Sequence, residues 1–277
     1  MDLAEKLGAW ARTESSISAV VWFGSRIRAA EDPTAGADAL SDWDFQIYTG
    51  RPGRFADGSW TRALGLELQT YVVRRAAIGG VPKVAALFVG AEADFVIVPA
   101  ARYHRLRWMV KLGWHRRSAR LRRTLQDLAV VIRPGWRFLK GAATWEPFYR
   151  RVVADIADPR LDADGVCNLA NGFRCDAVWT LRKIERGELI AAQRMLHRAL
   201  AETNLRLLHE LRLRRGEPTF PEGRRLERVG AADEVAAVSV SAGLDAGALR
   251  GAVEKSSVTC RELTRALVGT AWQWPAE

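Results

Sequence analysis

The chain has little cysteine and no long apolar run. Its 277 residues include three cysteines, Cys167, Cys175 and Cys260, an odd number without metal-ligand spacing, so we expect reduced, structural thiols. No apolar run approaches the length of a membrane span, and the N-terminal residues lack the basic-then-apolar pattern of a secretory signal. The sequence also contains no internal repeat and no low-complexity tract. We therefore expect a soluble, cytoplasmic protein, either a monomer or a homodimer.

The apolar content is ample for a core, and its pattern changes along the chain. Hydrophobic residues make up 48% of the sequence, enough for one large or two modest domains. Short apolar runs separated by Gly- and Pro-bearing turns fill the first half, and helical spacing fills the second. This pattern predicts an α+β fold, with a mixed β-sheet flanked by helices in residues 1–143 and a helical bundle in residues 144–277.

The individual elements follow from the spacing of apolar residues. Residues 2–14 are predicted as a helix with Asp2 as its cap, and residues 101–125 are also predicted to be helical. Five leucines recur at steps of seven and four residues: Leu189, Leu196, Leu200, Leu207 and Leu211. This spacing predicts an amphipathic helix that ends at Gly216. Strands are predicted near residues 18–23, 42–48, 66–73, 83–89, 93–98 and 128–132.

Three aspartates on predicted strands are the most informative residues. Asp42 and Asp44 are two residues apart, so their side chains project from the same face of a strand. Asp94 lies on a later apolar run, in a predicted hairpin with Gly90 near its turn. Carboxylates on apolar strands are costly unless they are paired or bind a metal. Brought together by adjacent strands, the three would form an oxygen-only site suited to Mg²⁺; the alternative is three unrelated surface aspartates.

A Gly-Ser pair ends the apolar run of residues 19–23. Gly24 lets the backbone approach a ligand closely, and successive amide groups with the Ser25 hydroxyl can hold phosphate oxygens. Arg26 follows directly and is either a charge-assisted phosphate contact or a surface arginine. Beyond it, the loop Ala29 to Leu40 is either a lid or an ordinary insertion.

The ordered combination of Gly-Ser, Asp-x-Asp and a third aspartate resembles the nucleotidyltransferase superfamily of the polymerase-β type. The aromatic Trp43 between the aspartates, and a basic residue after Gly-Ser, are most similar to the aminoglycoside adenylyltransferases, particularly the streptomycin-modifying group. The resemblance implies Mg²⁺-dependent transfer of AMP from ATP to a hydroxyl of a small acceptor, an aminoglycoside, with release of pyrophosphate. It implies that Asp42, Asp44 and Asp94 hold the metal. It further implies that Gly24 and Ser25 hold the terminal phosphates.

The resemblance also points to an acid in the second half of the chain. Related drug-modifying enzymes activate the acceptor hydroxyl with an acid outside the metal cluster, and Asp176 stands where a glutamate is more usual. Asp176 shares a helical face with Trp179, and an apolar ring beside it would raise its pKa toward that of a base. The alternative is an ordinary capping or surface acid. Glu185 and Glu188 are lesser candidates.

Cationic residues gather in two places. Arg182 and Lys183 follow Asp176 on its predicted helix, and they either reach the triphosphate or belong to a solvated face. A larger set of nine, with no acid among them, occupies residues 101–123: Arg102, Arg105, Arg107, Lys111, Arg116, Arg117, Arg120, Arg122 and Arg123. Tyr103, Trp108 and Trp114 are interleaved with them. This segment is either a nucleic-acid surface or a solvated helix.

The net charge of +10 bears on the acceptor. A polycationic aminoglycoside fits a basic chain less well than a nucleotide, a protein hydroxyl or an RNA end. Three hypotheses therefore stand: an adenylyltransferase for a small acceptor, a nucleotidyltransferase acting on RNA or protein in a toxin-antitoxin setting, and a non-catalytic nucleotide-binding relative. We favour the first, because a decayed enzyme has no physical reason to keep the three carboxylates and Gly-Ser together.

Overall fold

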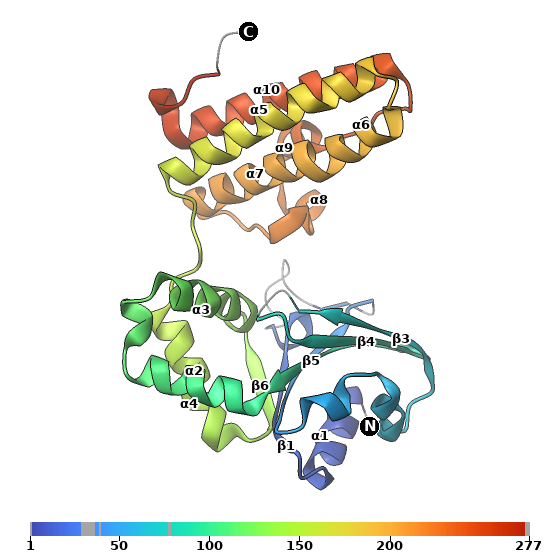
Figure 1. Ribbon diagram of the computed structural model, residues 1–277, viewed down its shortest axis with the longest axis vertical. Helices are drawn as coiled ribbons and strands as arrows, with labels where there is room; N and C mark the ends of the chain where they lie inside the picture. Colours follow the sequence, from blue (N-terminus) through green and yellow to red (C-terminus); the bar gives the residue numbers. More distant parts are fainter. Residues whose placement is uncertain (1, 29–36, 39, 77–78, 275–277) are drawn as a thin grey trace. The chain divides into compact units, whose positions relative to one another are not determined.

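The chain is α+β and forms two compact units. The computed structural model describes residues 2–28, 37–38, 40–76 and 79–274. The first unit, Met1–Pro159, holds a six-stranded sheet with helices on its faces, and the second, Arg160–Glu277, is helical (Figure 1). The first unit includes helix α4 (Ala142–Asp155), which the sequence-based division after residue 143 assigns to the second domain. None of the helices described is both long and apolar enough to cross a membrane.

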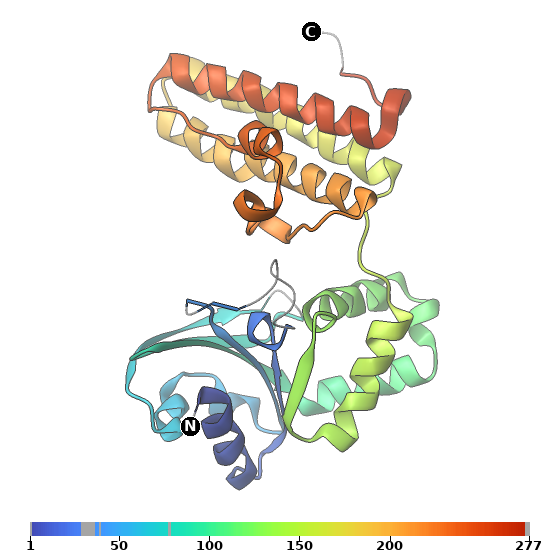
Figure 2. The same ribbon diagram turned by 180° about the vertical axis from the view of Figure 1, so that it is seen from behind.

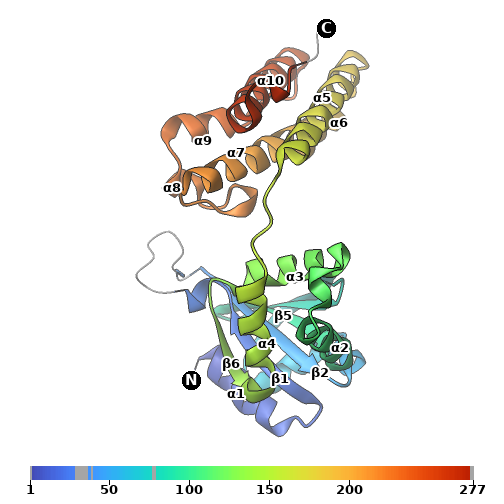
Figure 3. The same cartoon turned by 90° about the vertical axis from the view of Figure 1, so that its left-hand side faces the viewer.

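The sheet is mixed because one pair of its strands is parallel. Strands β2 and β5 run parallel, and every other neighbouring pair is antiparallel. The segment between β2 and β5 in sequence includes the hairpin of β3 and β4, and it is long enough for the crossover that parallel neighbours need. Figure 3 labels the two parallel strands, β2 and β5. The order across the sheet is β3 (Leu68–Arg75), β4 (Pro82–Phe88), β5 (Ala91–Pro99), β2 (Trp43–Thr49), β1 (Ile17–Phe23) and β6 (Trp136–Lys140).

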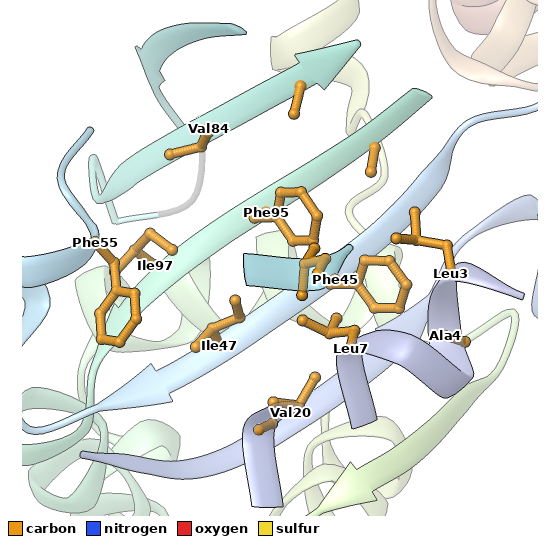
Figure 4. Packing of buried hydrophobic residues seen from close by; sticks show 14 of the residues in the cluster. Leu3, Ala4, Leu7, Val20, Phe45, Ile47, Phe55, Val84, Phe95 and Ile97 are labelled. Atoms are coloured by element: carbon orange, nitrogen blue, oxygen red, sulfur yellow. The ribbon is translucent and has the colours of Figure 1, made fainter. Parts of the chain in front are cut away.

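One face of the sheet packs against helix α1 (Leu3–Thr13). Asp2 caps the helix as predicted, and its side chain accepts a hydrogen bond from the Glu5 amide. Odd-numbered residues of β2 and β5 point to this face because side chains alternate along a strand. Phe45 and Phe95 are fully buried there with Leu7 of α1, and their rings stack with centroids 5.6 Å apart (Figure 4).

The opposite face packs against α2 (Ala100–Lys111), α3 (Ala119–Ile132) and α4. A polar triad is buried in this core. The Tyr48 and Tyr149 hydroxyls are 2.7 Å apart, and Gln46 accepts hydrogen bonds from both. Burial raises the pKa of both tyrosines, so they stay neutral and satisfy one another without a charge. Asp44, two residues before Gln46, shares this face of β2.

The second unit is built around three long helical segments. Helices α5 (Ala163–Glu185) and α10 (Ala246–Val268) pack side by side, and α7 (Glu202–Arg215) packs against α10 (Figure 2). The segment before α7 consists of α6 (Leu189–Met195) and a π-helical turn, Leu196–Ala201. The short helices α8 (Leu226–Val229) and α9 (Ala232–Val238) complete it.

The predicted leucine stripe is confirmed. Leu196, Leu200 and Leu207 are fully buried in the core of the second unit. The helix ends as predicted at Gly216, whose φ of +71° is the left-handed conformation typical of a helix C-terminus.

A carboxylate is buried in this unit beside two arginines. Glu210 has a side chain 4% exposed and accepts hydrogen bonds from Arg160, from Arg214 and from the Leu161 amide. Burial alone raises the pKa of Glu210, but these hydrogen bonds outweigh it and the pKa lies below its ordinary value of 4.5. The network ties the first residues of the second unit to α7.

Some predicted elements are corrected by the structure. The strand predicted over residues 128–132 is wrong, because this run is the end of helix α3. The helical stretch predicted over 101–125 is interrupted at Gly113, whose φ is +75°. Strand β6 was not predicted from the sequence; four of its five residues are half-buried and one is exposed. Most of the loop Ala29 to Leu40, proposed as a lid or insertion, lies outside the described residues.

Candidate functional site

The structure brings Asp42, Asp44 and Asp94 together. One carboxylate oxygen from each lies within 4.8 Å of the others, and all three residues are half-buried. Asp44 and Asp94 are direct partners in the parallel β2–β5 register. Asp42 lies just before β2, which begins at Trp43 and not at Asp42 as the sequence suggested.

The Asp44 carboxylate lies against Gly24. A Cβ added at Gly24 would be 2.2 Å from Asp44 Oδ2, closer than real Cβ atoms approach another atom. Gly24 also has φ +86° and ψ −161°, a conformation that is essentially restricted to glycine. The position follows from the β1–β2 register, in which Phe23 is the partner of Asp44. Both space and backbone conformation therefore require glycine beside this carboxylate.

The two residues after Gly24 have different environments. Ser25 Oγ is buried, and no hydrogen-bond partner for it exists among the described residues. The Arg26 Nε donates to the carbonyls of Ser41 and Asp42, at 3.0 and 3.2 Å, and the guanidinium lies 4.6 Å from the Trp43 ring centroid. Arg26 thus fastens the Gly-Ser turn to the segment that carries Asp42. The predicted role of Arg26 in nucleotide binding remains a proposal.

A cation that sequence analysis missed lies at the cluster. Lys83 of β4 forms an ion pair with Asp94 Oδ2, and the two side chains are 32% and 15% exposed. The β4–β5 register pairs Ala85 with Asp94, so Lys83 is two residues from that partner and on the same face. The hairpin at Gly90, which was predicted from the sequence, sets this register. Its register could have identified Lys83 as a neighbour of Asp94.

The donor set fits a divalent cation. Like charges at about 4 Å repel by about 1 kcal/mol in water and about 4 kcal/mol near a protein surface, so three gathered carboxylates cost stability unless a cation neutralises them. Lys83 already supplies one positive charge to Asp94. Carboxylate oxygens at this separation are the ligands that Mg²⁺ prefers. Asp42, Asp44 and Asp94 would hold such an ion.

The acid predicted on the acceptor side lies in the second unit. Asp176 is half-buried on α5, and desolvation raises its pKa above the ordinary value of 3.8, the direction predicted. Trp179 on the same helix is 53% exposed. A raised pKa is the property expected of a general base, and the catalytic role of Asp176 remains a proposal. Glu185 is exposed.

The two cations predicted on α5 differ in their surroundings. Arg182 is exposed. Lys183 Nζ donates to Glu188 Oε2 at 2.5 Å, and this bond is the largest cause of the lowered pKa of Glu188. Lys183 thus has a local carboxylate partner, which competes with any role at a triphosphate. Nucleotide binding by Arg182 and Lys183 stays a prediction.

Comparisons with known proteins give a distant likeness. No family model and no curated protein matches the chain. Among solved structures, the chain is similar to an aminoglycoside 6-adenyltransferase from Bacillus subtilis, with 13% identity and a TM-score of 0.35 over 99% of this chain and 94% of that one. It is also similar to a nucleotidyltransferase-like protein from Exiguobacterium sibiricum, with 10% identity and a TM-score of 0.35 over 96% of this chain and 76% of that one.

Proposed function

We propose that the chain is a Mg²⁺-dependent nucleotidyltransferase that moves AMP from ATP to a hydroxyl of a small acceptor. The observation that carries the proposal is the convergence of three carboxylates beside Gly24. Carboxylates gathered in this way repel one another, and a divalent cation that also binds the phosphates of a nucleotide would compensate that repulsion. The choice of ATP, and of an aminoglycoside as acceptor, rests on the sequence resemblance.

Each residue of the site has a proposed task. Asp42, Asp44 and Asp94 would hold Mg²⁺, which would neutralise phosphate charge. The backbone at Gly24 and the Ser25 hydroxyl donate to the terminal phosphates. Lys83, which pairs with Asp94, would turn to a phosphate oxygen if a metal held the carboxylates, and the site would then stay close to charge balance.

The reaction is a displacement at the α-phosphorus. The acceptor oxygen forms a bond to that atom, the bond to the bridging oxygen of the β-phosphate breaks, and pyrophosphate leaves. The acceptor proton passes to a carboxylate, for which Asp94 in the cluster and Asp176 on α5 are the candidates. Asp176 has the pKa shift that favours this role.

The test is pyrophosphate release by the purified 277-residue chain with ATP and Mg²⁺ over a panel of aminoglycosides, other hydroxylated drugs and RNA. We expect release with at least one acceptor and its loss, by a factor of at least about 10³, in Asp44→Ala, since the metal supplies most of the charge stabilisation. Asp127→Asn changes an exposed acid of α3 and is the matched control. Nucleotide binding without pyrophosphate release under any acceptor would instead support the non-catalytic hypothesis.

A further inference from the structure

A pocket of about 790 Å³ lies between α2 and α3 in the first unit. Cationic, aromatic and apolar side chains line it, and no acidic residue does so within the part of the chain that the structure describes. The residues that bear on its chemistry are Arg102, Arg105, Leu106, Met109, Trp114 and Arg120. A concave site with three guanidinium groups and no carboxylate selects an anionic ligand.

The positive charge extends well beyond the pocket. Of the nine cations in residues 101–123, all but Arg107 are exposed. Arg107 is held by the Thr144 carbonyl at 2.7 Å and lies over the Trp145 ring. The first acid after the segment is Asp127. Six exposed cations on α2 and α3, and Arg116 and Arg117 on the turn that joins these helices, repel one another. They exceed what one small anion would neutralise, so the surface fits a polyanion.

Two exposed tryptophans indicate which class of polyanion this surface binds. Trp108 and Trp114 are 55% and 56% exposed, unusually high for the largest apolar side chain. Lys111 Nζ lies 4.9 Å from the Trp108 ring centroid, so a cation and a flat ring are presented together. Exposed rings between cations are the arrangement that stacks unpaired bases while the cations follow the phosphates. An acidic protein partner would pair with the cations but would not require exposed aromatic rings between them.

We propose that the α2–α3 surface, defined as the pocket with Trp108 and the exposed cations of residues 101–123, binds single-stranded nucleic acid. The phosphates lie along the arginines, and bases stack on Trp108 and Trp114. This binding does not require the carboxylate cluster, so Asp44→Ala is expected to retain it. Failure of the proposed transfer reaction therefore leaves this proposal standing, and the reverse also holds.

The experiment measures the anisotropy of a labelled oligouridine of about twelve nucleotides, a length typical of single-strand sites, bound to the full chain at several salt concentrations. In the triple variant Arg102→Gln/Arg105→Gln/Arg120→Gln we expect weaker binding. The slope of log affinity against log salt should become shallower by about 2, because each lost phosphate contact removes about 0.7 from it. Arg12→Gln/Arg51→Gln/Arg62→Gln removes the same charge from exposed positions elsewhere in the unit and is expected to bind as the unchanged chain does.

Tryptophan variants test the stacking separately. Trp108→Leu and Trp114→Leu are each expected to weaken binding roughly tenfold while the salt slope stays unchanged, because they remove a ring and no charge. Binding of both oligodeoxythymidine and oligouridine would support a site for single strands of DNA and RNA alike. Preference for one of them would show which of the two nucleic acids the surface binds. Three results would overturn the proposal: a duplex that binds as tightly as the single strand, two arginine triple variants that lose affinity equally, or tryptophan variants that bind as the unchanged chain does. Circular dichroism establishes that the variants are folded.

Discussion

Lys83 and Asp94 form an ion pair within the cluster of three carboxylates, on the sheet face that carries Asp44. The pair joins the adjacent strands of the Gly90 hairpin. A lysine that neutralises one ligand competes with a divalent cation for the same oxygen. If the site binds metal and phosphate as proposed, its affinities for the two are linked through this one side chain.

Replacing Lys83 by glutamine is expected to move these two affinities in opposite directions. Less Mg²⁺ should be needed for half-maximal activity, because the competing ammonium is gone. The KM for ATP should rise about 10-fold or more, since a hydrogen bond to a charged group contributes about 1.5–3 kcal/mol. Steady-state kinetics over Mg²⁺ and ATP measure both quantities. Arg62→Gln is the control, and an unchanged Mg²⁺ requirement in Lys83→Gln would reduce the lysine to a structural role.

Gly24→Ala is expected to damage the site and the fold together. The added Cβ would displace the Asp44 carboxylate, and the glycine-only backbone conformation adds roughly 1–3 kcal/mol of strain. Chemical denaturation should show the lost stability, and metal titration should show weakened binding. Gly53→Ala, where a Cβ meets no atom within 4 Å, is the matched control. Normal metal binding in Gly24→Ala would contradict the close packing described.

Asp42→Asn separates metal binding from stability. If Mg²⁺ reaches ten times its dissociation constant, it should stabilise the unchanged chain by about 1.4 kcal/mol, which is roughly 3 °C in Tm for a chain of this size. In the variant this rise should disappear, while Tm in chelator stays the same or increases because one like charge is removed. Thermal shift with and without Mg²⁺ measures both. A preserved Mg²⁺ response would argue against Asp42 as a ligand.

Glu210→Gln is expected to lower the stability of the second unit. The variant leaves Arg160 and Arg214 without their shared carboxylate, at a cost of about 1–3 kcal/mol. Because the folded pKa lies below 4.5, the ionised form contributes stability that is present above pH 4.5 and is lost as the pH falls through the folded pKa. Urea denaturation from neutral to acid pH should show the difference between variant and unchanged chain shrinking. A difference independent of pH would exclude the ionised contact as its cause.

Asp176→Asn should show the opposite dependence on pH. The folded pKa is raised by desolvation, so ionisation above pH 3.8 opposes folding. The variant is therefore expected to be at least as stable as the unchanged chain at neutral pH, with no advantage below pH 3.8. If Asp176 is the base, activity should fall sharply while folding is retained. If the variant and the unchanged chain have equal kcat and the same pH profile, Asp176 is an ordinary surface acid and not the base.

Local rules predicted part of the carboxylate cluster. Spacing two apart places Asp42 and Asp44 on one side, and the glycine at residue 90 identifies the strand that carries Asp94. The pairing of Asp44 with Asp94 across β2 and β5 was expected from the family resemblance, because no local pattern specifies contacts between distant strands. The approach of Asp44 to Gly24 depends on the β1–β2 register, which no local pattern specifies.

Helix α3 shows why a short apolar run misleads. The run Leu128 to Ile132 resembles a buried strand when taken alone. Together with Leu125, its buried residues have the spacing of a helix face, and Val130 is 37% exposed. Only the longer window separates the two periods. The environments of Asp176 and Lys183 likewise depend on packing and local ion pairs that spacing does not reveal.

The parallel alignment of β2 with β5 has a consequence for synthesis and folding. Two of the three cluster aspartates leave the ribosome some fifty residues before the third, and an entire hairpin must form between them. A truncated product that ends before β5 therefore contains Asp-x-Asp but no chelating geometry. If the cluster holds a divalent ion as proposed, uptake of that ion would mark chains in which β2 and β5 have paired, which makes metal retention a simple assay for this step of assembly.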